Sequence, residues 1–395
     1  MSGGLDSSVA AALLKRAGSD ELRSSSRFAN ARVFDVIGVF MKFWAEPEKD
    51  GLVGASNRCC SPEAEIRARK VAKILKIPFY VLNFEKEFKK RIVDYFLEEN
   101  KLGLTPNPCV VCNKEIKFGL LLEKALFLDA DYVATGHYAR IKKDKTGIHL
   151  LRARDKNKDQ SYFLWKLNQE QLKRILFPIG NYTRKEVENL AKKFKLPVLK
   201  ARKSVEICFI QTTTNDFFRK HLKEKPGKII CLTPGVKQKV VGEHKGLWFY
   251  TIGQRKGIGL PGGPYWVLDK NIKENLLIVT KNERDLLKKE LICKNVNWIR
   301  APSDHSVLDR AQKICALVSG KQPKLPLKIK AKIRYRHQLA PATIIRLRSK
   351  VYSLKFKVAQ RAITPGQSVV FYSSAEASAK ADKGQELLGG GIIVS

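Results

Sequence analysis

The chain has 395 residues, enough for two or three domains that each have a core. Its 44% hydrophobic and 29% charged residues are typical of a globular protein, and no apolar run is long enough to span a bilayer. The 75 Lys and Arg against 38 Asp and Glu give a net charge of +37, which favours a polyanionic partner, most naturally nucleic acid. The 8 cysteines follow no secretion signal, so we expect a cytoplasmic protein with reduced thiols and no membrane partner.

Strands and helices alternate through the first half of the chain, which predicts an α/β fold with a doubly wound parallel sheet. Helices are expected up to about residue 18 and over residues 61–75, 85–99 and 115–128, and strands over residues 34–41, 79–82 and 132–134. A hairpin is expected over 141–154, mostly helical structure over 155–177, and a helix opened by a capping box at Thr183. Ligands bind at the carboxyl ends of such strands, so the opening loop, Met41 and Gly136-His137 should converge.

The second half changes to short strands broken by Gly and Pro. Residues 227–279 are predicted to form a small β-rich module, and residues 293–395 a six-stranded β-barrel. We therefore expect three domains: a catalytic domain over 1–213, a central module over 214–282 and a C-terminal barrel domain over 283–395.

The opening loop contains two glycines, Gly3 and Gly4, that allow a tight turn and close approach of backbone N–H groups to an anion. Ser7 and Ser8 add hydroxyl donors at a predicted helix N-terminus, where phosphate is favoured. Asp6 would repel a bare phosphate, so we expect it beside Mg²⁺ or as a cap for the loop. The string S-G-G-x-D-S-S resembles the pyrophosphate-binding loop of the ATP pyrophosphatases. That superfamily has a strand directly before the loop, and we expect this strand to be missing here through a misassigned start or a truncation.

The cysteines offer a second kind of chemistry. Cys109 and Cys112 form a C-x-x-C motif, but no matching second pair follows for a zinc site. Cys112 is expected at the start of a helix, where a thiolate is favoured, and Cys208 lies near the end of the predicted catalytic domain.

Seven motifs occur in order along the chain: T-P-N-P (105–108) with C-N (112–113), T-G-H-Y-A-R (135–140), K-N-K-D-Q-S-Y (156–162), I-C-F-I (207–210), Y-T-I-G-Q-R-K-G (250–257), R-Y-R (334–336) and T-P-G-Q-S (364–368). The series resembles the bacterial tRNA-specific 2-thiouridylase family over nearly the entire chain. The resemblance implies that ATP adenylates the C2 oxygen of the wobble uridine and that persulfide sulfur then displaces AMP. It also implies tRNA and an upstream persulfide donor as partners.

The resemblance further implies roles for individual residues. Cys208 would carry the persulfide, and Cys112 would release its sulfur and end in a Cys112–Cys208 disulfide. ATP and Mg²⁺ would bind at Ser2, Gly3, Gly4, Asp6, Ser7, Ser8, Met41 and Gly136. The flipped-out base would lie against Asn107, Pro108 and Cys109, the last of which is Asp in many members. The tRNA would contact His137, Lys158, Asp159, Gln160, Arg334, Tyr335 and Gln367.

Other interpretations of these residues stay open. Amide-forming ligases share the opening loop but need neither a cysteine pair nor a +37 charge. The chain could instead be a non-catalytic RNA-binding derivative, and His137 could be a core histidine. Cys109, Cys112 and Cys208 could also ligate three irons of a [4Fe–4S] cluster; otherwise we expect no metal site besides the Mg²⁺ that accompanies ATP.

Overall fold

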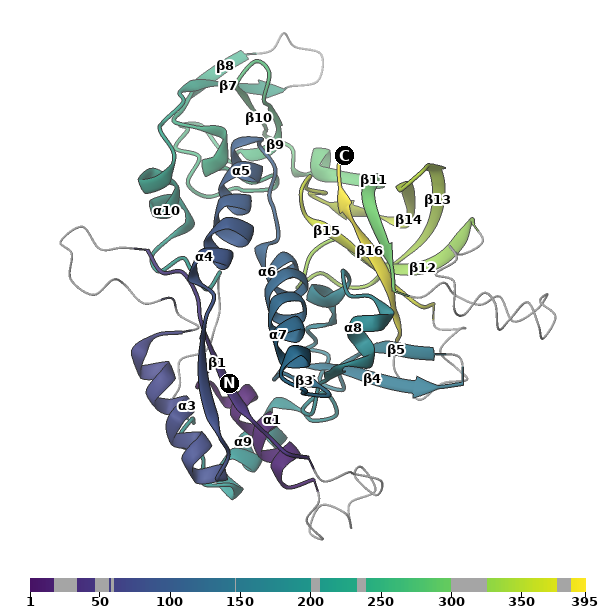
Figure 1. Ribbon diagram of the computed structural model, residues 1–395. Helices are drawn as coiled ribbons and strands as arrows, with labels where there is room; N and C mark the ends of the chain where they lie inside the picture. The colour runs from purple at the N-terminus through teal and green to yellow at the C-terminus, as the bar shows by residue number, and fades with distance from the viewer. Residues whose placement is uncertain are drawn as a thin grey trace. The chain divides into compact units, whose positions relative to one another are not determined.

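The structure is a computed structural model that describes residues 1–17, 34–46, 57, 60–145, 147–199, 207–232, 239–299, 325–374 and 385–395. The chain divides into two compact units (Figure 1). Unit 1 comprises the described residues of 1–93, 109–211 and 381–387, and unit 2 those of 94–108, 212–380 and 388–395. The expected division into three domains at 213/214 and 282/283 stays a prediction.

Unit 1 contains short parallel strand pairs, in agreement with the predicted α/β class. β1 (Gly38–Lys42) pairs in parallel with β2 (Phe79–Asn83), and β3 (Val133–Ala134) pairs in parallel with β6 (Ile175–Leu176). An antiparallel hairpin of β4 (Ala139–Asp144) and β5 (Gly147–Arg152) follows β3, as the sequence predicts.

The helices of unit 1 begin where their capping residues predict. Ser61 accepts a hydrogen bond from the N–H of Ala64, and Thr183 and Glu186 form the expected reciprocal capping box. The helices are α1 (Leu5–Lys15), α3 (Pro62–Leu75), α4 (Glu85–Phe88), α6 (Pro108–Cys112), α7 (Leu121–Phe127), α8 (Gln169–Lys173) and α9 (Arg184–Lys193), with π-helical segments over Lys89–Asp94 and Asn113–Leu120 and a 3₁₀ turn over Ser161–Leu164. In the part of the chain that the structure describes, no helix has the length and apolar character needed to cross a membrane.

The prediction of mostly helical structure over 155–177 is wrong. The segment contains one 3₁₀ turn, the five-residue α8 and the strand β6. The carboxylates of Asp155 and Asp159 accept hydrogen bonds from the backbone N–H groups of the loop between them and just beyond it. Such local side-chain acceptors compete with the helical hydrogen-bond pattern.

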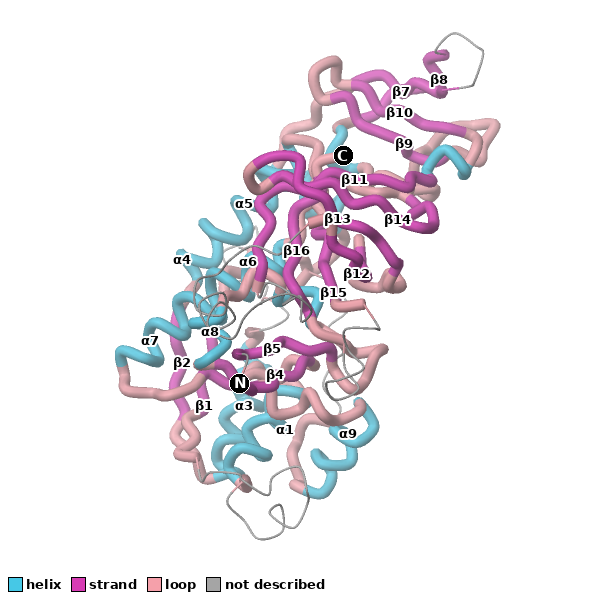
Figure 2. The backbone as a smooth tube through the Cα atoms, turned by 90° about the vertical axis from the view of Figure 1, so that its right-hand side faces the viewer, coloured by secondary structure: helices cyan, strands magenta, loops and turns pink. Residues whose placement is uncertain are grey.

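The largest core of unit 1 forms around α1. Val9, Ala12 and Leu13 are fully buried there, together with Val71 of α3 and Val187 of α9. Figures 1 and 2 both show α3, α1 and α9 side by side at one end of the unit. This packing fixes the N-terminal end of α1, where the opening loop lies.

Unit 2 contains a four-stranded sheet in the order β8-β7-β10-β9 and the helices that accompany it. The strands are β7 (Gly227–Leu232), β8 (Lys239–His244), β9 (Trp266–Asn271) and β10 (Leu276–Thr280), and the helices are α5 (Tyr95–Lys101), α10 (Thr214–His221) and 3₁₀ turns over Leu247–Phe249 and Glu283–Leu286. Val267, Leu277 and Val279 are fully buried in the core of this sheet.

The predicted six-stranded barrel is confirmed in unit 2. Its closed strand order is β11-β14-β13-β12-β15-β16. The strands are β11 (Leu287–Trp298), β12 (Leu327–Lys332), β13 (Ala340–Arg348), β14 (Val351–Arg361), β15 (Ser368–Tyr372) and β16 (Leu387–Ile393). Alternate inward-facing residues such as Ile344, Leu354 and Phe371 fill its interior.

Candidate active site

The opening loop turns sharply at Gly3 and enters α1 at Gly4. Gly3 has a φ of +64°, and a Cβ atom there would lie 2.0 Å from a backbone carbonyl oxygen of α3, so only glycine fits. The carbonyl of Gly4, the N-cap of α1, accepts hydrogen bonds from the N–H (3.2 Å) and hydroxyl (2.8 Å) of Ser8. The Ser7 hydroxyl accepts a bond from the N–H of Ser2 at 3.1 Å. The loop is therefore a compact turn at a helix N-terminus, where unpaired N–H groups and the helix dipole favour an anion.

Asp6 lies in the first turn of α1 and is held from two sides. Its Oδ1 accepts hydrogen bonds from the Tyr138 hydroxyl at 3.0 Å and from Arg184 at 2.9 Å. Burial raises the pKa of this carboxyl, while the charges of Arg184 and Lys158 act to lower it. Of the two roles expected for Asp6, that of a loop cap is wrong, because the hydrogen bonds to its carboxylate come from Tyr138 and Arg184 and not from N–H groups of the loop. Donors among the described residues bond only Oδ1 of Asp6. Oδ2 is therefore suited to bind Mg²⁺, which prefers carboxylate oxygens as ligands.

Tyr138 and Arg184 are site residues that sequence reasoning missed. Tyr138 stands in the T-G-H-Y-A-R motif, and Arg184 is the first residue of the helix that the Thr183 capping box predicted. Both residues could therefore have been noticed from features of the sequence. Arg184 also donates to Glu188 at 2.8 Å, which fixes its guanidinium beside Asp6.

Gly136 lies directly against the opening loop. A Cβ atom at Gly136 would be 2.6 Å from the carbonyl carbon of Asp6 and 2.6 Å from the amide nitrogen of Ser7. The loop after β3 and the opening loop therefore converge, as expected for the carboxyl ends of parallel strands. Met41 lies on β1 in register with Leu82, and its role in ATP binding stays a prediction.

His137 is buried within unit 1. Its Nδ1 lies 2.8 Å from the Thr135 hydroxyl, and its ring centroid lies 5.8 Å from those of Phe118 and Phe177. Burial, assisted by the charge of Lys117, lowers its pKa well below the usual value and keeps the ring neutral at pH 7. These surroundings favour the alternative of a core histidine over a contact with RNA.

The predicted tRNA residues Asp159 and Gln160 make hydrogen bonds inside unit 1. Asp159 accepts from Arg152 at 2.7 Å and from two backbone N–H groups, and Gln160 accepts from the N–H of Tyr138 at 2.9 Å. Lys158 is half-buried, and its charge acts on Asp6. The triplet thus holds a loop beside the opening loop, and its contact with tRNA stays a prediction.

The C-x-x-C motif lies on α6. The expectation that Cys112 begins a helix is wrong, because the helix starts at Pro108, a residue suited to a first helical turn. Cys109 is exposed, whereas Cys112 lies one turn further on and is buried. Cys112 immediately precedes the π-helical segment Asn113–Leu120, a type of distortion that is frequent at functional sites.

Cys208 is half-buried in unit 1, the unit that also contains Cys112. Its neighbour Phe209 is fully buried, with its ring centroid 6.0 Å from that of Phe88. Cys112 and Cys208 are both thiols in this structure, so their disulfide stays a prediction. Among the described residues, no three His, Cys, Asp or Glu side chains form a group that could hold a metal. Cys109, Cys112 and Cys208 therefore do not fit the donor set of an iron–sulfur cluster here.

Unit 2 holds the other predicted base and tRNA residues: Asn107, Pro108, Arg334, Tyr335 and Gln367. The Arg334 guanidinium donates to the Thr364 hydroxyl at 2.7 Å, and the Gln367 amide donates to a backbone carbonyl at 2.8 Å. Tyr335 is half-buried at the turn after β12.

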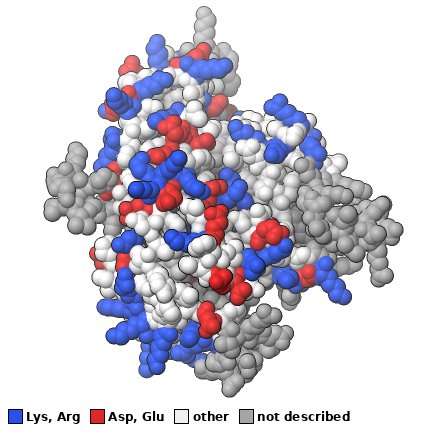
Figure 3. Space-filling model, viewed as in Figure 1, with Lys and Arg blue, Asp and Glu red and all other residues white. Residues whose placement is uncertain are grey.

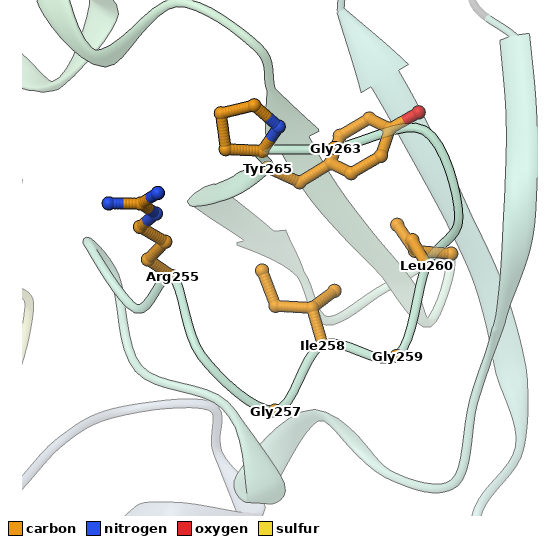
Figure 4. Close-up of a pocket in the computed structure, with 8 residues that line it drawn as sticks. Arg255, Gly257, Ile258, Gly259, Leu260, Gly263 and Tyr265 are labelled. Carbon is orange, nitrogen blue, oxygen red and sulfur yellow. The ribbon is translucent and has the colours of Figure 1, made fainter.

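A pocket of about 360 Å³ lies in the loop before β9 of unit 2. It is lined by Arg255, Gly257, Ile258, Gly259, Leu260, Gly263, Pro264 and Tyr265. Figure 4 shows Arg255 on one side and Leu260 and Tyr265 on the other, with the Tyr265 hydroxyl directed away from Arg255. Because Gly257 and Gly259 adopt positive φ values of +73° and +76°, this basic loop depends on glycine for its shape.

Positive charge is spread over the surface. Figure 3 shows Lys and Arg over much of the visible face, with Asp and Glu between them. Helix α3 alone carries four basic residues, Arg67, Arg69, Lys70 and Lys73. The charge that suggests a polyanionic partner is thus carried on the folded surface.

Comparison with known proteins gives consecutive family matches along the chain. The model of the tRNA methyl transferase HUP domain matches residues 1–212, that of the tRNA methyl transferase PRC-barrel domain residues 215–281, and that of the aminomethyltransferase β-barrel domain residues 288–393. The tRNA-specific 2-thiouridylase MnmA of Clostridioides difficile (strain 630) is 43% identical over 398 residues, covering 100% of this chain and 96% of the relative. The chain belongs to the tRNA-specific 2-thiouridylase family.

Further members of the 2-thiouridylase family match over the same extent. The MnmA of Clostridium perfringens (strain 13 / Type A) is 41% identical and covers 100% of this chain and 97% of the relative. The MnmA of Oceanobacillus iheyensis is 39% identical and covers 100% of this chain and 93% of the relative. The family resemblance stated from the seven motifs is therefore confirmed, and so is the order of a HUP domain, a small domain and a β-barrel.

Proposed function

We propose that this protein catalyses the ATP-dependent 2-thiolation of the wobble uridine of tRNA. The observation that carries the proposal is the match to 2-thiouridylases at 43% identity over 100% of the chain. The matched family descriptions name methyl transfer, whereas the curated relatives are named for thiolation. We follow the relatives, because a pair of cysteines serves sulfur transfer. An amide-forming ligase is not favoured, since the relatives that match the full chain are thiouridylases. ATP and tRNA as substrates favour a cytoplasmic location.

The nucleotide would bind at the opening loop. A glycine turn that ends at the N-terminus of α1 is suited to the pyrophosphate part of ATP. Asp6 would hold Mg²⁺ through Oδ2, and the ion would neutralise phosphate charge during pyrophosphate release. Arg184 and Lys158 lie close enough to Asp6 to supply further positive charge to the phosphates.

The thiolation reaction would proceed in three steps, after which the cysteines are reset. The uridine C2 oxygen attacks the α-phosphorus of ATP, pyrophosphate leaves, and C2 now carries an adenylate that can depart. The Cys112 thiolate attacks the inner sulfur of a Cys208 persulfide, forming the Cys112–Cys208 disulfide and releasing hydrosulfide. Hydrosulfide then attacks C2 and AMP leaves with the original oxygen. A two-electron reductant returns both cysteines to thiols, and an upstream donor reloads the persulfide.

Unit 2 would contribute to tRNA binding and to the target-base loop. Asn107 and Pro108 lead into Cys109, and together they would line the pocket for the flipped-out base. Arg334 and Tyr335 would contact the tRNA from the barrel, and Lys158, Asp159 and Gln160 from unit 1. Gln367 would act on the target-base loop, because its side-chain amide bonds the Thr105 carbonyl. For His137 we favour a structural role, because its ring is buried.

The proposed activity is tested with purified protein, unmodified tRNA, Mg-ATP and a persulfide donor. We expect one AMP, one pyrophosphate and one 2-thiouridine per turnover, with the nucleoside identified by mass spectrometry after digestion of the tRNA. Omission of ATP or of the donor should abolish 2-thiouridine. Sulfur-free, methylated uridine as the product would instead support the methyl-transfer description.

A further inference from the structure

The chain segment that precedes the catalytic cysteines is fastened to the barrel of unit 2. The N–H of Thr105 donates to the carbonyl of Pro365 at 2.9 Å, and the side-chain amide of Gln367 donates to the carbonyl of Thr105 at 2.8 Å. Only the Nε2 atom of Gln367 can make this second bond, because a carbonyl oxygen is purely an acceptor. Thr105 is therefore bonded through both of its backbone polar groups to one turn of the barrel.

This turn, Thr364–Gln367, lies so close to the segment that no side chain fits between them at Gly366. Gly366 has a φ of +89°, and a Cβ atom there would lie 2.7 Å from the amide nitrogen of Thr105 and 2.9 Å from Leu104. The contact therefore requires glycine both for its backbone angle and for its space.

The barrel holds the turn rigidly. The N–H of Gly366 donates to the carbonyl of Ile393 in β16, and the N–H of Ile393 donates to the carbonyl of Gln367, both at 2.9 Å. The Arg334 guanidinium donates to the Thr364 hydroxyl at 2.7 Å and also to the carbonyl of Ala362. Of two residues with predicted tRNA contacts, Arg334 thus supports this turn and Gln367 belongs to it.

The rest of the segment is also anchored within unit 2. In α5 the Phe96 ring stacks on Phe218 with centroids 5.6 Å apart, and a Cβ atom at Gly103 would lie 2.0 Å from the side chain of Ile272. Only three residues separate Thr105 from Cys109, where α6 continues toward Cys112. The position of Thr105 thus limits where the intervening Asn107 and Pro108 can lie.

We propose that the Thr364–Gln367 turn is a positioning element for the target-base loop, residues 105–108, and that Gln367 acts through Thr105 rather than on the tRNA. The inference rests on the proposed role of Asn107 to Cys109 at the base. Reactive groups need placement to within about 1 Å, and a misplacement of that size costs on the order of a hundredfold in rate. Loss of the Gln367 bond should therefore slow the chemical step while leaving tRNA affinity unchanged.

The test compares Gln367→Glu with the matched variant Gln360→Glu. Gln360 also lies in the barrel and donates its side-chain amide to a backbone carbonyl, that of Val358 at 2.7 Å, which is not part of the loop. A glutamate at either place is nearly isosteric and cannot donate the bond at pH 8. The readouts are the single-turnover thiolation rate at saturating tRNA, the dissociation constant for tRNA, and hydrogen exchange of the Thr105 amide.

For Gln367→Glu we expect a rate about 10- to 100-fold lower, an unchanged dissociation constant and about tenfold faster exchange at Thr105. Gln360→Glu should change none of the three. Weaker tRNA binding with a normal rate at saturation, or unchanged exchange at Thr105, would overturn the proposal. Asn107→Ala tests separately the proposal that residues 107–109 line the base pocket. A normal thiolation rate in that variant would show that the loop does not line the pocket, whatever the exchange of the Thr105 amide.

Discussion

Replacement of Gly4 by valine should abolish pyrophosphate release while the protein folds normally. A Cβ atom at Gly4 meets only the Ser2 hydroxyl, at 3.4 Å, and the backbone there is extended, with φ of −91° and ψ of 165°. Valine is thus tolerated by the folded protein, but its side chain would stand where, in the proposed binding mode, the pyrophosphate approaches the backbone. We expect a loss of at least about a hundredfold in pyrophosphate release, comparable to removing a key electrostatic donor. The measurement is a coupled pyrophosphate assay with saturating tRNA.

Gly3 provides the contrast for this variant. A Cβ atom at Gly3 would lie 2.0 Å from a backbone oxygen of α3, so Gly3→Val should lower the melting temperature as well as the activity. Gly4→Val should keep both the melting temperature and the tRNA affinity of the unaltered protein. Normal pyrophosphate release by a folded Gly4→Val protein would remove the opening loop from ATP binding.

Substitution of Cys112 or Cys208, the two cysteines proposed to transfer sulfur, should eliminate 2-thiouridine, but with different protein products. Cys208→Ser has no thiol to load, so labile sulfur should be absent from that position after incubation with a donor. Cys112→Ser can be loaded at Cys208 but cannot release the sulfur, so persulfide should accumulate without thiolated tRNA. Each change should lower the rate by more than about a thousandfold, the scale found when a covalent nucleophile is lost. Tryptic peptide mass spectrometry maps the persulfide and the disulfide.

Cys293 supplies the control for the cysteine variants. It is fully buried in the barrel, and burial raises the pKa of its thiol to about 12, so it should stay unreactive. Cys293→Ala should retain both persulfide loading and sulfur transfer. Stoichiometric iron in anaerobically purified protein, without persulfide at Cys208, would overturn the exchange mechanism in favour of a cluster.

Local sequence signals predicted much of the fold because the interactions behind them join residues that are close together in the sequence. Ser61-Pro62 and Thr183 with Glu186 satisfy helix N–H groups within one turn, so the starts of α3 and α9 could be predicted from four residues each. The barrel followed from regularly spaced short strands. Residues 155–177 were mispredicted because Asp159 takes Arg152 and two backbone N–H groups as partners, a choice that depends on the fold around it.

The sequence predicted which motifs contribute to the candidate site, but not which residues of different motifs are hydrogen-bonded to each other. The pairing of Asp6 with Arg184 spans 178 residues, and that of Thr105 with Gln367 spans 262, so no local pattern could reveal either. Sequence resemblance assigned Gln367 and Arg334 to tRNA. In the structure the Gln367 side chain bonds Thr105 of the loop, and Arg334 bonds Thr364 in the same turn as Gln367. A motif indicates that a residue matters, and only its contacts indicate through which partner it acts.

The fate of the uridine C2 oxygen tests the central claim most directly. A tRNA with ¹⁸O at C2 of the wobble uridine is incubated with the protein, ATP and a persulfide donor, and the AMP is analysed by mass spectrometry. If the oxygen is adenylated and then displaced by sulfur, each AMP formed with a 2-thiouridine carries one ¹⁸O. Unlabelled AMP, with the ¹⁸O found in water or retained in the uridine, would contradict activation of the C2 oxygen by ATP.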